Sequence, residues 1–225
     1  MRAYPAAKRD RSSLPVGAPD FLGDMRFRRL LSAEAWAGLP EAVRRRFAKR
    51  LRGGESAVYC GRIAETRLSR AGRWLARLLT VIGGPLPVDD DNEGTPAIVT
   101  VTEATDNAGQ YWTRQYNRTG RFPQVIHSAK AFAGPTGLEE CVGGGIGMTL
   151  RLRTAANSLL FVSDRYFWSL LGRRVYLPRF LEPGRLTVGH EDLGGGRFAF
   201  TLDLVHPLLG ALVHQRIVFR DMTEA

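Results

Sequence analysis

Aromatic and arginine side chains alternate in one short stretch of the chain. Trp112, Arg114 and Tyr116 occupy every second position, so on a β-strand they share one face. A second aromatic pair follows at Tyr166 and Trp168. Aromatic rings that line a hollow together with one or two guanidinium groups suit an anionic, amphipathic ligand such as a fatty acid or a phospholipid. One alternative is that the aromatic side chains only form the hydrophobic core, while the arginine side chains extend to water. A second is that the aromatic rings stack on the bases of single-stranded nucleic acid, which is a partner we do not expect.

The four histidines offer acid–base chemistry but no metal site. None lies at the i, i+4 or HxH spacing that is typical of zinc ligands. His190 beside Glu191, or His214 across a hairpin from Asp203, would form an acid–base pair. We count His127 and His214 among the candidate ligand-binding residues. An enzyme acting on the same ligand would need His127, His190 and His214 to converge.

The glycine cluster between Gly143 and Gly147 resembles a phosphate-binding loop only in composition. A dinucleotide-binding loop follows a strand and opens a helix, whose N-terminal amides meet the phosphate. Here the glycines lead into an alternating run that begins at Met148, so we predict a β-turn or bulge. No nucleophile elbow surrounds Ser163-Asp164 either. We therefore assign no catalytic residue, no metal and no cofactor.

These candidate residues must be positioned by β-strands, and the clearest strands lie at the C-terminal end. Between 197 and 204, phenylalanine and leucine alternate with polar or small residues, which predicts a strand with one buried face. His206-Pro207-Leu208-Leu209-Gly210 favours a turn, because proline keeps His206 out of the helical region and Gly210 can adopt a positive φ angle. A second apolar run over 211–219 completes a long antiparallel hairpin.

Most of the remaining chain also reads as strands joined by short turns. The predicted strands cover residues 56–66, 97–103, 110–116, 122–132, 138–142, 148–153, 159–168 and 185–192. Short turns imply antiparallel neighbours, and a sheet of about nine or ten strands must curl or close. We predict an α+β domain: one large, strongly curved antiparallel sheet or partial barrel, wrapped around two to three amphipathic helices.

Two of the predicted helices are strongly basic. The first begins near Pro40, and the second, Ser69 to Ile82, carries an apolar stripe opposite its arginines. Helices with tryptophan, leucine and arginine bind membrane interfaces, although such helices also pack on sheets with a solvated basic face. The candidate contacts for a membrane or another anionic surface are Arg45, Lys49, Arg70, Trp74 and Arg77.

Length and composition place the chain among globular proteins. It has 225 residues, of which 44% are hydrophobic and 24% charged, and its net charge is +10. We predict an irregular tail over residues 1–20 and a single β-rich domain over 21–225. The positive charge suits an anionic membrane surface or an acidic ligand, but an arginine-rich composition alone also explains it.

The chain lacks the usual signals of export. No run of about twenty apolar residues is present, and the basic N-terminus is not followed by the apolar region of a secretory signal. Cys60 and Cys141 lie far apart without CxxC spacing, so we expect free thiols. We expect a cytoplasmic location, with attachment to the inner face of the membrane as an open alternative.

Six short motifs occur in a recognisable order. They are Leu39-Pro40-Glu41-Ala42-Val43-Arg44, Gly61-Arg62, Gly84-Pro85-Leu86-Pro87, Trp112-Thr113-Arg114, Leu171-Gly172 with Leu177-Pro178, and Pro207-Leu208-Leu209-Gly210-Ala211-Leu212-Val213. In this order they resemble a bacterial family of domains of unknown function, number 4166, over nearly the whole folded part. The resemblance departs at 212–216, where an aromatic residue and a glycine are more usual.

The resemblance implies a fold of its own without an assigned activity. In that family the domain sometimes follows a nicotinamide-dinucleotide-type reductase or lies beside membrane domains, which suggests a reductase-type partner protein. No dinucleotide-binding fingerprint is present in this chain.

Two functions remain open on the sequence. The first is a non-catalytic module that binds a lipid-like small molecule or a membrane surface. The second is an accessory domain that partners a reductase or membrane protein and binds nothing small. A continuous apolar cavity favours the first, and a tightly packed interior favours the second.

Overall fold

The fold is taken from a computed structural model of the chain. It describes residues 23–51, 55–104, 109–170 and 173–221. The predicted irregular tail over 1–20 and the Leu171-Gly172 motif lie outside the described residues.

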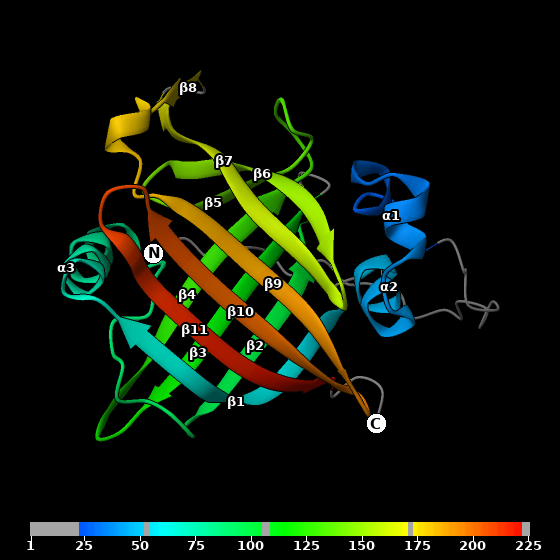
Figure 1. Cartoon of the computed structure of the whole chain (residues 1–225), viewed down its shortest axis with the longest axis horizontal. Coiled ribbons are helices and arrows are strands. Elements are labelled where there is room, and N and C mark those ends of the chain that lie inside the picture. Colours follow the sequence, from blue (N-terminus) through cyan, green and yellow to red (C-terminus); the bar gives the residue numbers. More distant parts are fainter. Residues whose placement is uncertain (1–22, 52–54, 105–108, 171–172, 222–225) are drawn as a thin grey trace, which may run out of the picture.

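Ten strands form a closed antiparallel barrel, which confirms the predicted curved sheet (Figure 1). Around the ring the order is β6-β5-β4-β3-β2-β1-β11-β10-β9-β7, and β7 pairs again with β6. Short β8 pairs only with β7. The strands are β1 (Ser56–Leu68), β2 (Pro96–Glu103), β3 (Gln110–Arg118), β4 (Arg121–Ala131), β5 (Glu139–Gly143), β6 (Ile146–Ala155), β7 (Ser158–Leu170), β8 (Arg173–Tyr176), β9 (Arg185–Gly194), β10 (Arg197–His206) and β11 (Gly210–Asp221).

The alternation of apolar side chains along each strand explains which face turns inward. On β10, Phe198, Phe200, Leu202 and Leu204 are all buried, as the period of two predicts. The predicted turn between β5 and β6 is also confirmed, and Gly144 and Gly145 adopt positive φ angles there. Sequence alternation therefore fixed both the strands and the inner face of the barrel.

The helices lie at the two ends of the barrel (Figure 1). At one end are η1 (Arg28–Leu30), α1 (Ala33–Ala37) and α2 (Glu41–Ala48), and at the other are α3 (Arg70–Leu78) and η2 (Leu79–Ile82). A last turn, η3 (Arg179–Leu181), joins β8 to β9. The expectation of a sheet wrapped around helix is corrected here, because the strands surround side chains and the helices cover the open ends.

Helix α3 lies unusually close to the barrel. Ser69 caps its first turn by accepting a hydrogen bond from the Gly72 amide, 3.0 Å away. A Cβ atom at Gly72 would lie 1.9 Å from the carbonyl oxygen of Leu212 on β11, so only glycine permits this approach. The absence of one side chain therefore sets how tightly α3 covers its end of the barrel.

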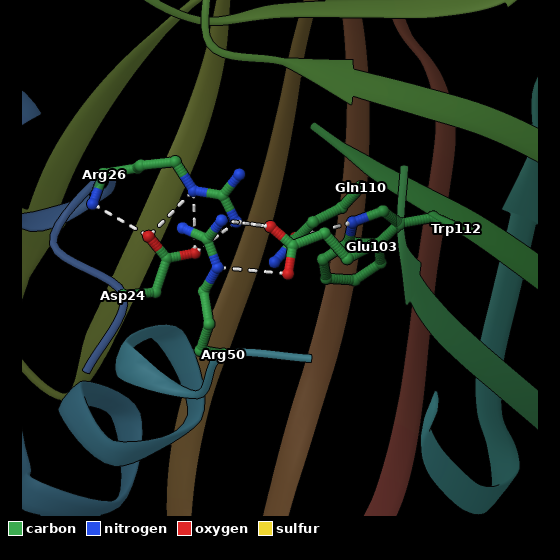
Figure 2. A network of polar contacts seen from close by, with 6 residues as sticks. All are labelled: Asp24, Arg26, Arg50, Glu103, Gln110 and Trp112. Atoms are coloured by element: carbon green, nitrogen blue, oxygen red, sulfur yellow. Dashed lines mark hydrogen bonds and ion pairs between the residues drawn. The ribbon is translucent and has the colours of Figure 1, made fainter. Parts of the chain in front are cut away.

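The opposite end is closed by a network of ion pairs (Figure 2). Asp24 accepts hydrogen bonds from the backbone and side chain of Arg26, and Arg26 also pairs with Glu103 at 3.2 Å. Glu103 in turn accepts from Arg50, with its nearest contact at 2.6 Å. Below this network, the Trp112 indole donates to Gln110 at 3.2 Å. The ion pairs to Glu103 fasten the N-terminal helical segment to β2.

Candidate functional site

The half of the barrel next to α3 is hollow. A cavity of about 210 Å³ lies there. At about 30 Å³ for each water-sized group, it has room for about seven such groups. Its walls are almost entirely aliphatic, and the side chains that line it include Leu75, Leu79, Ile82, Ile146, Met148, Leu177, Leu181, Leu186, Val188, Leu202 and Leu204. A chain-like apolar group inside it would therefore be largely removed from water.

The polar wall of the cavity belongs to a cluster of three side chains from neighbouring strands, and two of the three line the cavity. Glu140 on β5 and Arg114 on β3 both line it, and Lys130 on β4 lies between their strands. Glu140 Oε1 accepts from Arg114 Nη2 at 3.1 Å, and Glu140 Oε2 accepts from Lys130 Nζ at 2.8 Å. Lys130 is directly opposite Glu140 in the β4–β5 register, so strand pairing itself brings these charges together.

This cluster carries more positive than negative charge. Burial alone would raise the pKa of Glu140, but the charges of Lys130 and Arg114 outweigh it and lower that pKa from 4.5 to about 2. The carboxylate is therefore ionised, and it faces two cations. Burial lowers the pKa of Lys130 below its ordinary 10.5, against the attraction of Glu140. With Arg114 and Lys130 charged, the net charge of the cluster is +1.

One donor of the cluster has no acceptor. Arg114 is buried, and among the described residues its Nε atom has no hydrogen-bond acceptor. A buried donor without a partner costs about 1–3 kcal/mol. An anionic group in the cavity would balance the excess positive charge of the cluster.

Tyr166 adds a neutral polar group to the same cavity. Its ring is buried on β7 and lines the hollow. Burial raises the pKa of Tyr166 to about 12, so its hydroxyl stays protonated at neutral pH. It is a hydrogen-bonding group and not a base.

The other half of the interior is packed with aromatic rings around His190. The His190 ring lies 4.9 Å from Phe47, 5.5 Å from Phe200 and 5.7 Å from Phe161. The cavities found there among the described residues are small, about 20 and 10 Å³. Burial first, and then the charges of Arg46, Lys130 and Arg114, hold the pKa of His190 well below 6.5. This half contains a neutral histidine in a solid core.

Four of the seven predicted ligand-binding residues lie inside the barrel. Arg114 and Tyr166 line the cavity. Trp112 and Tyr116 share the inner face of β3 with Arg114, as their spacing predicts, but neither lines the cavity. Trp112 packs in the aromatic half, with its ring 5.8 Å from His190.

The other three predicted ligand-binding residues lie outside the cavity. Trp168, at the end of β7, is 47% exposed and donates to the Gly144 carbonyl at 3.0 Å. His127 is exposed on β4, with Nδ1 3.1 Å from the Thr113 hydroxyl. His214 lies on the outer face of β11 and makes the expected pair with Asp203, at 2.7 Å. The histidines therefore do not converge on the cavity.

The five predicted membrane or anion contacts divide between the two ends of the barrel. Arg45 and Lys49 belong to α2 and its C-cap, beside the ion-pair network. Arg70, Trp74 and Arg77 lie on α3, over the cavity. The three α3 residues are exposed. Only this second group is near the hollow half.

Two residues of the polar wall were not singled out from the sequence. Lys130 and Glu140 come from separate strands, and only the β4–β5 register makes them partners. A weak signal was present, because Lys130 is a charged residue on the same face of its predicted strand as Ile126 and Ser128. A charged side chain at an inward position of an otherwise apolar strand face would have identified Lys130 as a candidate site residue.

Comparison with known proteins gives one match. A family model described as Domain of unknown function (DUF4166) matches residues 39–219. No curated protein and no solved structure matches the chain. In the described part of the chain, no helix combines the length and the apolar character needed to cross a bilayer.

Proposed function

Because the chain belongs to the family described as Domain of unknown function (DUF4166), we propose its function from its own geometry: the barrel binds an amphipathic small molecule with an apolar chain and an anionic head. The observation that carries this proposal is the aliphatic cavity of about 210 Å³ with the Arg114–Glu140–Lys130 cluster in its wall. An apolar pocket with a few convergent polar groups is the usual form of a small-molecule site.

The size of the cavity indicates a slim ligand. It is below the range of about 300–1,000 Å³ that is typical of pockets for drug-sized molecules. A single medium-length acyl chain suits such a volume better than a ring system or a complete two-chain lipid. A longer chain would extend past Leu181, which lines the cavity and is also exposed.

The polar wall favours an anionic head over a neutral one. A carboxylate in the cavity near Arg114 would reduce the net charge of the cluster from +1 to zero and would accept charge-assisted hydrogen bonds from its guanidinium group. Hydrogen bonds of this charge-assisted kind are about twice as strong as neutral ones. A fatty acid is the simplest molecule with both required features.

Filling the cavity should abolish binding. We expect Leu204→Trp to weaken decanoate binding at least tenfold, because the larger ring would occupy space that the chain needs. The matched control is Val205→Trp, since Val205 is the next residue on β10 and is exposed. Isothermal titration with decanoate, on protein purified without detergent, would measure both. Native mass spectrometry of the same preparation should show a co-purified ligand of fatty-acid mass.

The head group should be recognised through Arg114. The wild-type protein should prefer decanoate to decanol by about tenfold, and Arg114→Met should remove most of that preference while retaining affinity for decanol. In this variant Glu140 still pairs with Lys130, so the fold should persist. Circular dichroism would verify the fold. Equal binding of acid and alcohol by the wild type would refute an anion-specific site.

A clean apo spectrum, together with no binding of decanoate, would overturn the proposal as a whole. The barrel would then be an interaction domain for a protein partner, such as a reductase. The two outcomes are separated by the same titration.

A further inference from the structure

Large apolar side chains are exposed around the end of the barrel that holds the cavity. They come from three segments: α3 with η2, the β8–η3 connection, and the β10–β11 turn. Figure 1 shows these segments together at the α3 end. We call this group the collar, and it consists of Trp74, Leu78, Val81, Phe180, Leu208 and Leu209.

The collar is not a set of partly covered core residues. Val81 is 83% exposed, Phe180 81% and Leu208 88%. Single exposed apolar residues are ordinary, but a gathering of several from three segments marks an interaction site. On α3 and η2 the opposite side is apolar as well, because Leu75, Leu79 and Ile82 line the cavity. The α3–η2 segment is therefore apolar toward the barrel and also toward solvent.

Arginines accompany the collar. Arg70 and Arg77 on α3, Arg179 on η3 and Arg185 at the start of β9 are exposed, and in the described part of the chain no ion pair joins them to a carboxylate. Nearby Arg73 does pair with Asp90, at 3.3 Å. The exposed face thus combines apolar tips with positive charge that the described residues do not neutralise.

The collar is continuous with the cavity. Leu181 lines the cavity and is 60% exposed, next to Phe180 of the collar. A molecule leaving the cavity past Leu181 would therefore meet the collar before it met bulk water. This path connects the proposed ligand to the surface that the collar contacts.

We propose that the collar docks this end of the barrel onto a bilayer with anionic headgroups, and that the ligand passes between bilayer and cavity past Leu181. Tryptophan, phenylalanine and leucine enter the headgroup–acyl boundary, while arginines attract the anionic lipids. A protein partner would be expected to present a shaped surface, whereas separate apolar tips with arginines between them suit a fluid one. The passage of ligand rests on the proposed function, but the docking itself requires no ligand.

Vesicle flotation of the apo protein tests the docking. We expect binding to phosphatidylcholine vesicles that contain phosphatidylglycerol, and at least tenfold weaker binding to phosphatidylcholine alone. The triple variant Val81→Ser, Phe180→Ser, Leu208→Ser should lose binding at least tenfold. All three positions are strongly exposed, so the fold should be preserved. Tyr111→Ser, at an exposed position on β3, is the control for loss of a surface aromatic.

A second pair of variants tests the charge. Arg70→Gln with Arg77→Gln should weaken binding to the anionic vesicles about tenfold. The matched control is Arg153→Gln with Arg197→Gln, which removes the same charge from exposed positions at the α2 end. If both pairs weaken binding equally, the attraction is only that of net charge and the collar is not the docking surface.

The outcomes separate this inference from the proposed function. Decanoate binding in solution without any vesicle binding would overturn the docking alone. Vesicle binding without decanoate binding would overturn the cavity ligand and leave the docking. Sedimentation of the wild type as a dimer that the serine variant converts to a monomer, with vesicle binding unchanged, would identify the collar as a contact between two copies and overturn the inference.

Discussion

Replacing Glu140 by glutamine should lower the free energy of unfolding by about 3–5 kcal/mol. Among the described residues, Glu140 is the carboxylate that pairs with Lys130 and Arg114 inside the barrel, at 2.8 and 3.1 Å. Without it, two cations would remain buried with no anion beside them. Such uncompensated charge is among the most destabilising changes that a core accepts. Urea denaturation at neutral pH would measure the loss.

Two companion variants show whether the loss comes from charge. Glu191→Gln changes a carboxylate on the outer face of β9, which pairs with Arg216 at 2.8 Å where both side chains are about one-third exposed, and it should cost at most about 1 kcal/mol. Lys130→Met combined with Glu140→Gln leaves one buried cation, Arg114, in place of two, and should recover part of the stability. If the double variant is no more stable than Glu140→Gln alone, the charge explanation is wrong.

The same variant links stability to the proposed ligand. Glu140→Gln raises the net charge of the cluster to +2, so an anionic ligand should stabilise this variant more than it stabilises the wild type. The measurement is the shift in unfolding temperature on adding decanoate. An equal shift for both proteins would place the head group away from the cluster.

His190→Phe should flatten the loss of stability that the wild type shows between pH 7.5 and 5. The folded pKa of His190 is well below 6.5, so below pH 6.5 the unfolded chain binds a proton that the folded chain does not. Stability therefore falls as the pH falls through this window. At 1.36 kcal/mol for each pH unit, the wild type should lose about 2 kcal/mol by pH 5. Phenylalanine keeps an aromatic ring among Phe47, Phe161 and Phe200 but does not titrate.

The window is chosen to isolate this group. The stability contributed by Glu140 is present above its ordinary pKa of 4.5 and is lost only as the pH falls toward its folded pKa of about 2. Denaturation at pH 7.5, 6 and 5 therefore reports His190 with little contribution from Glu140. His127→Gln measures the background of removing an exposed histidine. A His190→Phe variant with the same pH slope as the wild type would show that His190 is not buried as described.

The strands and their inner faces could be predicted from the sequence, because residue alternation within a strand determines which side chains share a face. Alternation placed Phe198 to Leu204 inward, and the same period placed Trp112, Arg114 and Tyr116 on one face. The closure of the barrel could not be predicted from these patterns, because it requires β6 to pair with β7 and β1 to pair with β11 at the same time. The position of the helices was also missed, because an amphipathic stripe fits the end of a barrel as well as its interior.

The site was predictable only in part, for a related reason. Arg114 and Tyr166 were identified by residue type, and both line the cavity. Trp168 has the same spacing to Tyr166 as neighbours on an inner face, yet it lies at the strand end beyond the cavity. Which half of the interior is packed depends on the N-terminal rings of Phe27 and Phe47, which reach Phe161 from outside the sheet. The alternation of residues within a strand does not predict this contact between the N-terminal rings and Phe161.

The seam between β1 and β11 has a consequence for synthesis in the cell. Gln215 donates to Thr66 across it at 3.2 Å, although the two residues are 149 positions apart. During synthesis, β1 and β10 have no hydrogen-bonding partner at one edge until β11 has been made. The apolar faces of the strands are also exposed to solvent in that period. Open edges of this kind invite pairing with other chains. We therefore expect a nascent chain that stalls before β11 to bind chaperones until β11 is synthesised and pairs with β1 and β10.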